Sequence, residues 1–352
     1  MYDFLIVGHG IAGSLLGWQL ENAGRSCYYI DAPQQVAATE VAAGIINPIT
    51  GRRFVKSWRI DHLVPLARDT YRELEAALGI RIYYELPLVR TLFTAGDQNN
   101  WHARYLDPEY RAYLAEEAEL GEITAITKPA LGYGEVLQTA RVDIGKLQRS
   151  LRARRLSQGC LSEQHFHHQA LDIYSDYVQY AGIPARQVIF CEGWRSRFNP
   201  FFNSLPFKGN KGEILHIRTQ APLLKRMFKH KVFLIPLPDD TYWIGSTSDN
   251  HFTHEEPEST RAAQLENDLR QVLQLPFQII DHQAAVRPTI RDRRPLVGRH
   301  PHYPHLWILN GLGTKGASLA PLAVQQLVAH ILDGAPLLDE INIDRFSSYW
   351  SK

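Results

Sequence analysis

Two short stretches near the start decide the fold: residues 4–13 read FLIVGHGIAG, and residues 27–31 read CYYID. An apolar run leads into three closely spaced glycines, an amphipathic segment follows, and a second apolar run ends in an acid. This periodicity predicts a strand, a tight turn, a helix and a second strand. The chain is therefore expected to begin with one compact βαβ unit.

At each of the three glycines, a side chain would block either the turn itself or a close approach of the backbone. Gly8 allows a sharp turn out of the strand, Gly10 allows the backbone to approach a diphosphate, and Gly13 allows the helix to pack close to the strand. The helix start, at Ile11 and Ala12, offers unpaired amides and a partial positive charge. The pattern predicts a dinucleotide-binding turn.

An acid closes the second strand of this unit. Asp31 lies eighteen residues after Gly13, where a carboxylate can accept hydrogen bonds from both hydroxyls of an adenosine ribose. An arginine there would indicate a 2′-phosphate instead. We assign Ala32 and Thr39, in the loop that follows, to the same nucleotide site.

Two later strands also lead into glycine turns. The run 187–191 is almost entirely apolar, which predicts a central strand, and the run 306–309 precedes the sequence NGLGTKG and a helix over 317–332. Since parallel sheets bind ligands beyond the carboxyl ends of their strands, both turns are expected to face the cofactor. The residues assigned to it here are Glu192, Gly193, Trp194, Gly311, Gly313, Thr314, Lys315 and Gly316.

The intervening segments indicate a second lobe. Strand-like runs at 82–84 and 89–93 with a short acidic helix around 112–120, and three strands at 211–217, 232–237 and 242–247 before a helix at about 259–273, predict an antiparallel sheet. Helices are expected over 60–78 and 142–155. We therefore divide the chain into a nucleotide-binding domain of residues 1–78, 141–208 and 283–352, and a second domain of residues 79–140 and 209–282.

Composition argues against several classes of function. The 352 residues include 38 basic and 37 acidic side chains, a net charge of +1, which provides no general footprint for nucleic acid or a membrane surface. No apolar run approaches the roughly 18 residues that span a bilayer, and the chain enters a strand without a cleavable signal. We expect a soluble, cytoplasmic protein.

Cysteines and histidines do not suggest a metal site. The three cysteines are far apart, and Cys27 and Cys191 lie in apolar runs, which is typical of buried thiols. His165, His167 and His168 cluster but lack a helical pair of ligands with a nearby carboxylate. No metal is predicted.

Two segments leave two interpretations open. The small residues Ala43 and Gly44 allow a flat cofactor ring to rest on the backbone, although an ordinary helix start reads the same way. The basic stretch with Arg52, Arg53, Lys56 and Arg59 is either a solvated loop or a loop that attracts an anionic substrate group.

The order of these motifs resembles the family of FAD-dependent amine and amino-acid oxidases typified by D-amino-acid oxidase, glycine oxidase and sarcosine oxidase. The resemblance begins at the glycine turn with Asp31 and at 42–44. It continues through 192–195, 211–213 and Arg287-Pro288, and reaches the glycine loop after residue 310. The oxidoreductase half of the enzyme that builds methylaminomethyl groups on tRNA wobble uridine is also similar, especially over 311–313.

The resemblance implies an α/β fold, α+β overall. A Rossmann-like FAD-binding domain of discontinuous segments is joined by an antiparallel-sheet substrate domain. It implies noncovalent FAD, because no cysteine follows Cys191. Arg287 matches the arginine that binds a substrate carboxylate, and a guanidinium suits that task. Lys315 matches a loop position where a cation stabilises reduced flavin. Glycine oxidase has an arginine where this chain has Thr314.

The resulting prediction is an FAD-dependent oxidoreductase that oxidises the C–N bond of a small amine or amino acid by hydride transfer to flavin N5. Two alternatives stay open. One is action on a modified nucleoside in tRNA, for which the basic loop would bind phosphate. The other is a flavin-binding protein without turnover. The substrate, the electron acceptor and the oligomeric state are not predicted.

Overall fold

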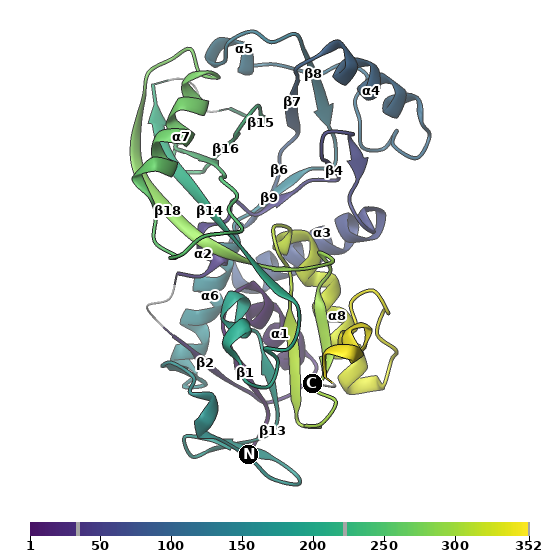
Figure 1. Cartoon of the computed structure of the whole chain (residues 1–352), viewed down its shortest axis with the longest axis vertical. Helices are drawn as coiled ribbons and strands as arrows, with labels where there is room; N and C mark the ends of the chain where they lie inside the picture. The colour runs from purple at the N-terminus through teal and green to yellow at the C-terminus, as the bar shows by residue number, and fades with distance from the viewer. Residues whose placement is uncertain (33–35, 221–223, 351–352) are drawn as a thin grey trace. The chain divides into compact units, whose positions relative to one another are not determined.

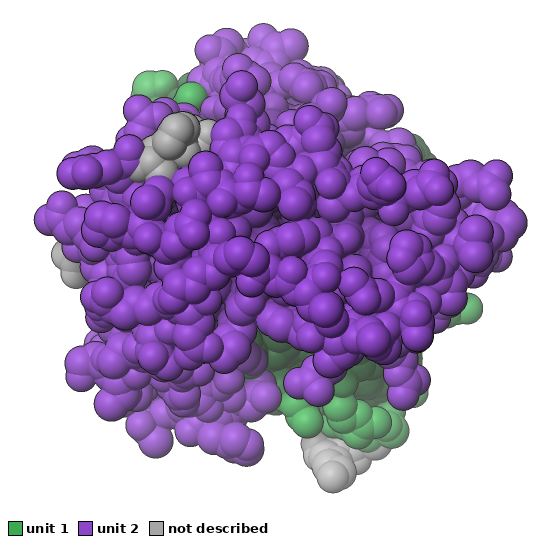
Figure 2. Space-filling model, turned by 90° about the horizontal axis from the view of Figure 1, so that it is seen from above, with its two compact units in different colours: residues 1–42, 144–210, 286–352 green, residues 43–143, 211–285 purple. Residues whose placement is uncertain are grey.

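The structure is a computed structural model that describes residues 1–32, 36–220 and 224–350. Its contacts divide into two units, coloured separately in Figure 2. Unit 1 comprises residues 1–42, 144–210 and 286–352, and unit 2 comprises residues 43–143 and 211–285. Each unit has its own large sheet.

The sheet of unit 1 is mainly parallel, as the glycine-turn motif predicts (Figure 1). Its parallel strands are, in spatial order, β10 (Leu161–Glu163), β2 (Cys27–Asp31), β1 (Tyr2–Val7), β13 (Ile183–Phe190) and β20 (Leu306–Asn310). Strands β12 (Val178–Tyr180), β11 (Leu171–Ile173) and β19 (Leu296–Arg299) join antiparallel. The nearly apolar β13 pairs with both β1 and β20, so its predicted central place is confirmed.

Alternation along β1 supplies apolar side chains to both faces of this sheet. Leu5 and Val7 belong to a buried cluster with Phe190. Ile6 points the other way, toward the helix that follows the glycine turn: a Cβ atom placed on Gly13 would lie 3.3 Å from the Ile6 Cγ2. The principal helices of the unit are α1 (Ile11–Asn22), α6 (Ile144–Ser157) and α8 (Gly316–Asp333).

Unit 2 is built on a seven-stranded, largely antiparallel sheet. Within it, β15 (Met227–Lys229) and β7 (Leu88–Leu92) pair in parallel. The spatial order is β18 (Phe277–Ile290), β14 (Phe207–Thr219), β17 (Tyr242–Gly245), β16 (Phe233–Pro236), β15 (Met227–Lys229), β7 (Leu88–Leu92) and β8 (Gly132–Val136). Helix α7 (Ser259–Arg270) packs Leu265 and Leu269 into the core on one face of this sheet.

Residues 43–78 group with unit 2 rather than with the nucleotide-binding unit in which the sequence analysis places them. Strand β3 (Ile45–Ile46) pairs with β9 (Ala140–Val142), which also pairs with β6 (Tyr83–Glu85). Tyr71 of α3 (Ile60–Leu78) stacks on Tyr83 with ring centroids 6.5 Å apart. These long-range pairings attach residues 43–78 to unit 2, and no local sequence pattern predicts them.

The acidic helix expected around 112–120 does not form, and that prediction is wrong. The backbone there pairs instead with β8, and Ala115 N–H donates to the Glu135 carbonyl at 3.0 Å. Helices form on either side, at α4 (Ala95–Leu106) and α5 (Ile123–Ile126). Helix α4 starts at a capping box of Thr94 and Asp97, which is a sequence signal for the start of a helix.

The remaining elements are short. They are α2 (Ala38–Val41), β4 (Ile49–Thr50), β5 (Val55–Lys56), and the 3-10 turns His168–Ala170, Gly193–Phe198 and Ile343–Tyr349. Within the described residues, no helix has both the length and the apolar character needed to cross a membrane.

The packing of β3 on β9 predicts different consequences for two glycines of unit 2 with the same backbone conformation. Gly44 (φ +71°) has no room for a Cβ atom, which would lie 1.8 Å from the Val142 carbonyl oxygen, whereas Gly51 (φ +76°) faces open space. The positive φ should lower the free energy of unfolding by roughly 1–2 kcal/mol in both Gly44→Ala and Gly51→Ala. Gly44→Ala should lose about 1–3 kcal/mol more because of the clash. Urea unfolding of the two variants tests this, and equal losses would contradict it.

Candidate cofactor site

The carboxyl ends of β1 and β13 meet at one edge of the unit 1 sheet. Cys191 N–H donates to the Val7 carbonyl at 2.7 Å. Immediately beyond, Gly8 has φ +97°, and a Cβ atom on it would lie 2.4 Å from the Cys191 carbonyl oxygen. Only glycine therefore fits at Gly8, because two backbone segments touch there.

Helix α1 starts directly over this turn. A Cβ atom on Gly13 would lie 2.0 Å from the Gly8 carbonyl oxygen, so the helix lies against the turn as the motif predicts. Thr39 is buried, and its hydroxyl accepts a hydrogen bond from Ile11 N–H at 2.9 Å. A Cβ atom on Gly10 would lie 3.2 Å from that hydroxyl.

The first turn of α1 suits an anion. It carries no acidic side chain, and Gly10 supplies no side-chain cap. Within the described residues, the amides of Ala12 and Gly13 donate no hydrogen bond. Unpaired amides and the positive end of the helix dipole favour a diphosphate at this place.

Asp31 lies beside the same turn. Its Oδ1 accepts a hydrogen bond from His9 N–H at 3.0 Å, and its other oxygen pairs with Arg152. Arg152 also bonds Glu163 at 2.9 Å, so the carboxylate of Asp31 is held between fixed partners at the end of β2. Ala32 follows it, half-buried.

The turns after β13 and β20 are joined by one side chain that the sequence analysis did not select. The Asn310 amide nitrogen donates to the Gly193 carbonyl at 2.9 Å and to the Ser196 hydroxyl at 2.6 Å, while its oxygen accepts from Gly311 N–H at 2.7 Å. Asn310 therefore locks the two turns together.

Glu192 serves this framework with its carboxylate. It bonds His168 Nε2 at 2.7 Å and accepts from the Asn199 amide at 2.8 Å, and only 8% of its side chain is exposed. Because its carboxylate is engaged in these bonds, Glu192 would make the predicted cofactor contact through its backbone. Trp194, also assigned to the cofactor, is buried in the following turn.

The glycine loop after β20 brings a second helix start to this edge. Gly311 (φ +74°) and Gly313 (φ +55°) take left-handed conformations, and Gly313 N–H donates to the Pro288 carbonyl at 3.1 Å. Lys315 is the N-cap of α8, with Thr314 exposed before it. A Cβ atom on Gly316 would lie 3.6 Å from the Ile11 side chain, so α1 and α8 begin next to each other.

Two partly buried cations accompany this loop. Arg287 precedes Pro288 and donates from Nη1 to the Asn210 side-chain oxygen; burial lowers the pKa of its guanidinium to about 10, which leaves it charged at neutral pH. Burial, followed by the neighbouring Arg294 and Arg293, also lowers the pKa of Lys315.

The other assigned residues belong to unit 2. Ala43 is buried, and the glycine at Gly44 is required by the Val142 carbonyl within that unit, which is a structural reason for the small residues. In the basic loop, Lys56 pairs with Asp61 at 2.5 Å, and Arg59 lies over the Trp58 ring at 5.5 Å. Arg52 and Arg53 are exposed.

A buried network beneath the glycine turn was not found from the sequence. His9 and Arg155 are 0% and 1% exposed, and Arg155 Nη1 lies 2.6 Å from His9 Nε2. Arg155 also bonds the Ser14 carbonyl at 3.1 Å and Glu21 at 3.2 Å, and lies 4.0 Å from the centre of the Tyr29 ring. Burial, assisted by Arg155, lowers the pKa of His9 well below its usual value. The imidazole is therefore neutral and accepts from Arg155.

The cysteines and histidines form no recognisable metal centre. In residues 1–32, 36–220 and 224–350, no three histidine, cysteine or acidic side chains group in a way that could hold a metal ion. All three cysteines are free, and Cys27 and Cys191 are buried as predicted. Burial raises the pKa of the Cys27 thiol to about 12.

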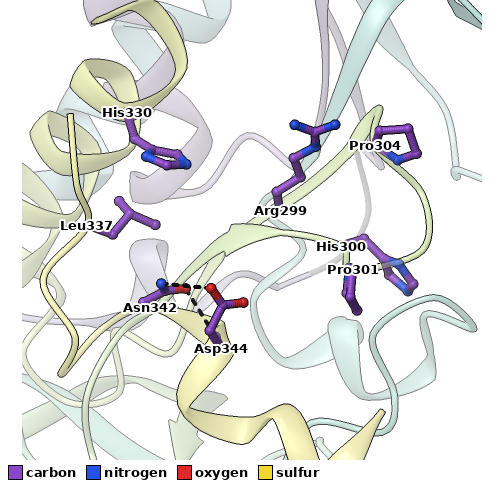
Figure 3. Close-up of a pocket in the computed structure, with 8 residues that line it drawn as sticks. All are labelled: Arg299, His300, Pro301, Pro304, His330, Leu337, Asn342 and Asp344. Atoms are coloured by element: carbon purple, nitrogen blue, oxygen red, sulfur yellow. Dashed lines mark hydrogen bonds between the residues drawn. The ribbon is translucent and has the colours of Figure 1, made fainter. Parts of the chain in front are cut away.

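A separate pocket of about 250 Å³ opens in unit 1 and contains none of the residues assigned to the cofactor (Figure 3). His330 bonds the Ala335 carbonyl at 2.7 Å, and the Asn342 amide donates to Asp344 at 3.0 Å. Its polar groups are thus partly engaged within the protein. The lining residues are Arg299, His300, Pro301, Pro304, His330, Leu337, Asn342 and Asp344.

Residues 3–330 match the family described as FAD dependent oxidoreductase, abbreviated DAO. The chain belongs to this family. The converging helix starts and the glycines that fit only as glycines agree with an FAD-binding fold. FAD is accordingly the cofactor of this oxidoreductase, and the predicted α/β class with a discontinuous nucleotide-binding domain is confirmed.

Individual relatives are distant. Glycine oxidase of Geobacillus kaustophilus is 25% identical over 355 residues, covering 91% of this chain and 90% of that protein. Its crystal structure superposes with a TM-score of 0.79 over 98% of this chain and 97% of that one, at 21% identity.

Two bifunctional proteins are also similar. The bifunctional protein ThiO/ThiG of Nostoc sp. is 23% identical over 97% of this chain, which spans 55% of that protein's length. The tRNA 5-methylaminomethyl-2-thiouridine biosynthesis bifunctional protein MnmC of Acinetobacter baylyi is 44% identical over 69 residues, 18% of this chain and 11% of that protein.

The network beneath the turn predicts a large effect of one buried arginine. Arg155→Met would leave Glu21 and His9 without their shared donor, and breaking a buried ion pair costs about 3–5 kcal/mol. Arg154→Met is the matched control, because Arg154 is exposed and its guanidinium lies over the Trp18 ring at 5.5 Å, so this variant should lose about 1 kcal/mol or less. Unfolding free energies of both variants, measured in urea, decide the comparison; an Arg155 variant as stable as its control would refute the buried role.

Proposed function

We propose that this FAD-dependent oxidoreductase oxidises the C–N bond of a primary or secondary amine that carries a carboxylate, such as an amino acid or an N-substituted glycine. The observation that carries the proposal is the half-buried guanidinium of Arg287, next to Pro288, whose carbonyl holds the glycine loop. The similarity to glycine oxidase supports the same class of substrate.

Arg287 would bind and orient the substrate. A guanidinium holds a carboxylate by two parallel hydrogen bonds and fixes the direction of the carbon next to it. Asn210 holds Nη1 through a neutral acceptor, which orients the guanidinium without neutralising its charge. Burial strengthens the attraction for an anion because little water competes.

The groups that we propose to hold FAD lie along the edge of the unit 1 sheet. The first turn of α1 would bind the diphosphate, Asp31 the ribose, and the glycine loop with Lys315 the flavin. When bound, FAD supplies the two-electron acceptor for oxidation of the C–N bond. We propose noncovalent attachment, because Cys27 and Cys191 are buried and burial raises the pKa of the Cys160 thiol.

A modified uridine in tRNA is a second candidate substrate. The 44% identity to the tRNA-modifying protein favours it, although over 69 residues only. Of the four cations expected to bind tRNA phosphates, Lys56 already pairs with Asp61. A flavin-binding protein without turnover is the other alternative, and it differs from the proposal in that no amine would reduce its flavin.

Substitution of Arg287 tests the proposal through the flavin colour. The holoprotein is mixed anaerobically with amino acids and N-methylglycines while the flavin absorbance at about 450 nm is followed. In Arg287→Lys the planar two-bond contact is lost, and hydrogen bonds to a charged group are each worth about 1.5–3 kcal/mol. The substrate concentration for half-maximal bleaching should therefore rise roughly ten- to hundredfold.

Arg291→Lys is the matched control, because Arg291 is exposed and donates to the Tyr349 hydroxyl; it should bleach like the unaltered protein. If no carboxylate-bearing amine bleaches the unaltered flavin, the proposal is wrong. If amines without a carboxylate are affected equally by Arg287→Lys, the assigned role of that residue is wrong.

Lys315 is expected to set the reduction potential of the flavin. A cation beside the ring favours the additional negative charge of the reduced form, so Lys315→Met should make the two-electron midpoint potential more negative by about 30 mV, equivalent to about 1.4 kcal/mol. Lys208→Met, which removes an exposed lysine of unit 1, serves as control. Potentiometric titration measures both, and an unchanged potential in the Lys315 variant would remove this residue from the flavin site.

A further inference from the structure

Two cations face each other on neighbouring strands of unit 2. Arg90 of β7 and Lys229 of β15 are register partners in a parallel pair, so their side chains leave the same face of the sheet. The adjacent partners Val89 and Phe228 lie in the apolar core on the opposite face. Like charges placed opposite each other in a sheet are destabilising.

No carboxylate forms an ion pair with either cation in the part of the chain that the structure describes, although Asp97 and Asp268 act on them through space. Arg90 reaches the Gly51 carbonyl at 3.5 Å, and Lys229 donates to the Lys231 carbonyl at 2.6 Å. Neither cation has an ion-pair partner within 4.0 Å among the described residues. The Arg90 Nε is buried and has no hydrogen-bond acceptor there either.

The nearest acids already have other roles. Asp97 accepts hydrogen bonds from Phe93 N–H at 2.9 Å and from Thr94 N–H at 3.2 Å as part of the helix cap. Asp268 acts on Lys229 only through space. His230 and Lys231, which follow Lys229 in the chain, supply no negative charge.

Aromatic residues hold the two cations and the basic loop in place. The Arg90 guanidinium lies over the Phe54 ring at 4.4 Å, and Lys229 lies over the Phe233 ring at 4.5 Å. Phe54 is buried edge-on against Trp101, with centroids 5.4 Å apart. Both ends of the segment 51–54 therefore contact Arg90.

The exposed Arg52 and Arg53 lie in this pinned segment. Arg104 bonds the Arg53 carbonyl at 3.5 Å, which fixes the loop further. The backbone that carries Arg52 and Arg53 is thereby held beside Arg90 in unit 2.

We propose that Arg90 and Lys229, bordered by Arg52 and Arg53, form a binding site for a phosphate monoester. A phosphate monoester carries about two negative charges at neutral pH and so balances the two facing cations. Its oxygens can accept from a guanidinium fork and from an ammonium at the same time. The site is independent of the amine-oxidation proposal.

Inorganic phosphate is the probe for this site, used with the FAD-loaded full chain in isothermal titration at fixed ionic strength. One phosphate should bind per chain, and Arg90→Met and Lys229→Met should each weaken its affinity at least about tenfold. Arg218→Met removes an exposed arginine of the same unit and should leave the affinity unchanged. Acetate at the same ionic strength should not compete.

A second measurement stays informative if a titration variant folds poorly. Burial and then Arg90 lower the pKa of Lys229 to about 8, so its amine is partly uncharged and reactive at that pH. A bound phosphate favours the charged ammonium and raises this pKa. Phosphate should therefore slow acylation of Lys229 several-fold, as followed by mass spectrometry. Lys225, with an 82% exposed side chain, is the internal control.

The conservative variant Arg90→Lys keeps the charge and should retain most of the protection of Lys229, whereas Arg90→Met should abolish it. If acetate competes as effectively as phosphate binds, at the same ionic strength, the proposal is wrong, because the effect would then be common to all anions. Acylation of Lys229 that phosphate does not slow would also overturn it.

Discussion

The organisation of unit 1 depends on a backbone contact between two strand ends. Where β1 and β13 finish side by side, the carbonyl of Cys191 occupies the space that any side chain at Gly8 would need. The chain must turn sharply there, and the turn places the start of α1 against the Gly8 carbonyl. Neighbouring α8 begins beside α1 for a related reason, since the glycine loop before it is tied to Pro288. Two positive helix ends at one sheet edge follow directly, and this edge is where we propose that the cofactor binds.

A second constraint lies under that turn. Arg155 crosses from α6 to His9 and Glu21, and it is almost completely buried. A buried cation is tolerated only when its donors are satisfied, so this network ties α6, α1 and β2 to one geometry. Asp31 is positioned by the same side of the unit through Arg152. The geometry of the proposed nucleotide edge thus depends on charged side chains that are paired within the protein.

Unit 2 shows the opposite electrostatic arrangement. Its apolar core is conventional, but its sheet brings Arg90 of β7 and Lys229 of β15 into register, and among the described residues neither cation has an ion-pair partner. Stacking on Phe54 and Phe233 provides a partial substitute for a counter-ion. Arg155 differs from this pair, because its charge is balanced by Glu21 within the protein. The lack of such a partner is the reason for proposing that the pair binds an external anion.

Local sequence determined much of unit 1. The glycine spacing, the apolar strands and Asp31 lie within 31 residues, and short-range patterns of this kind specify a βαβ unit without help from distant parts. Helix α3 was likewise predictable, because its apolar stripe and the glycine that ends it are local. Arg287 and Lys315 could be selected from the sequence by resemblance, and their cofactor and substrate roles remain proposals.

The tertiary structure decided what depends on distant partners. Residues 43–78 joined unit 2 because β3 pairs with β9 almost a hundred residues later, and the acidic run 112–120 lost its helix to pairing with β8. Asn310, Arg155 and the facing pair of Arg90 and Lys229 carry no local signal at all. Whether an arginine is buried, paired or opposed by another cation depends on which strand or helix lies beside it, and only the folded chain settles that.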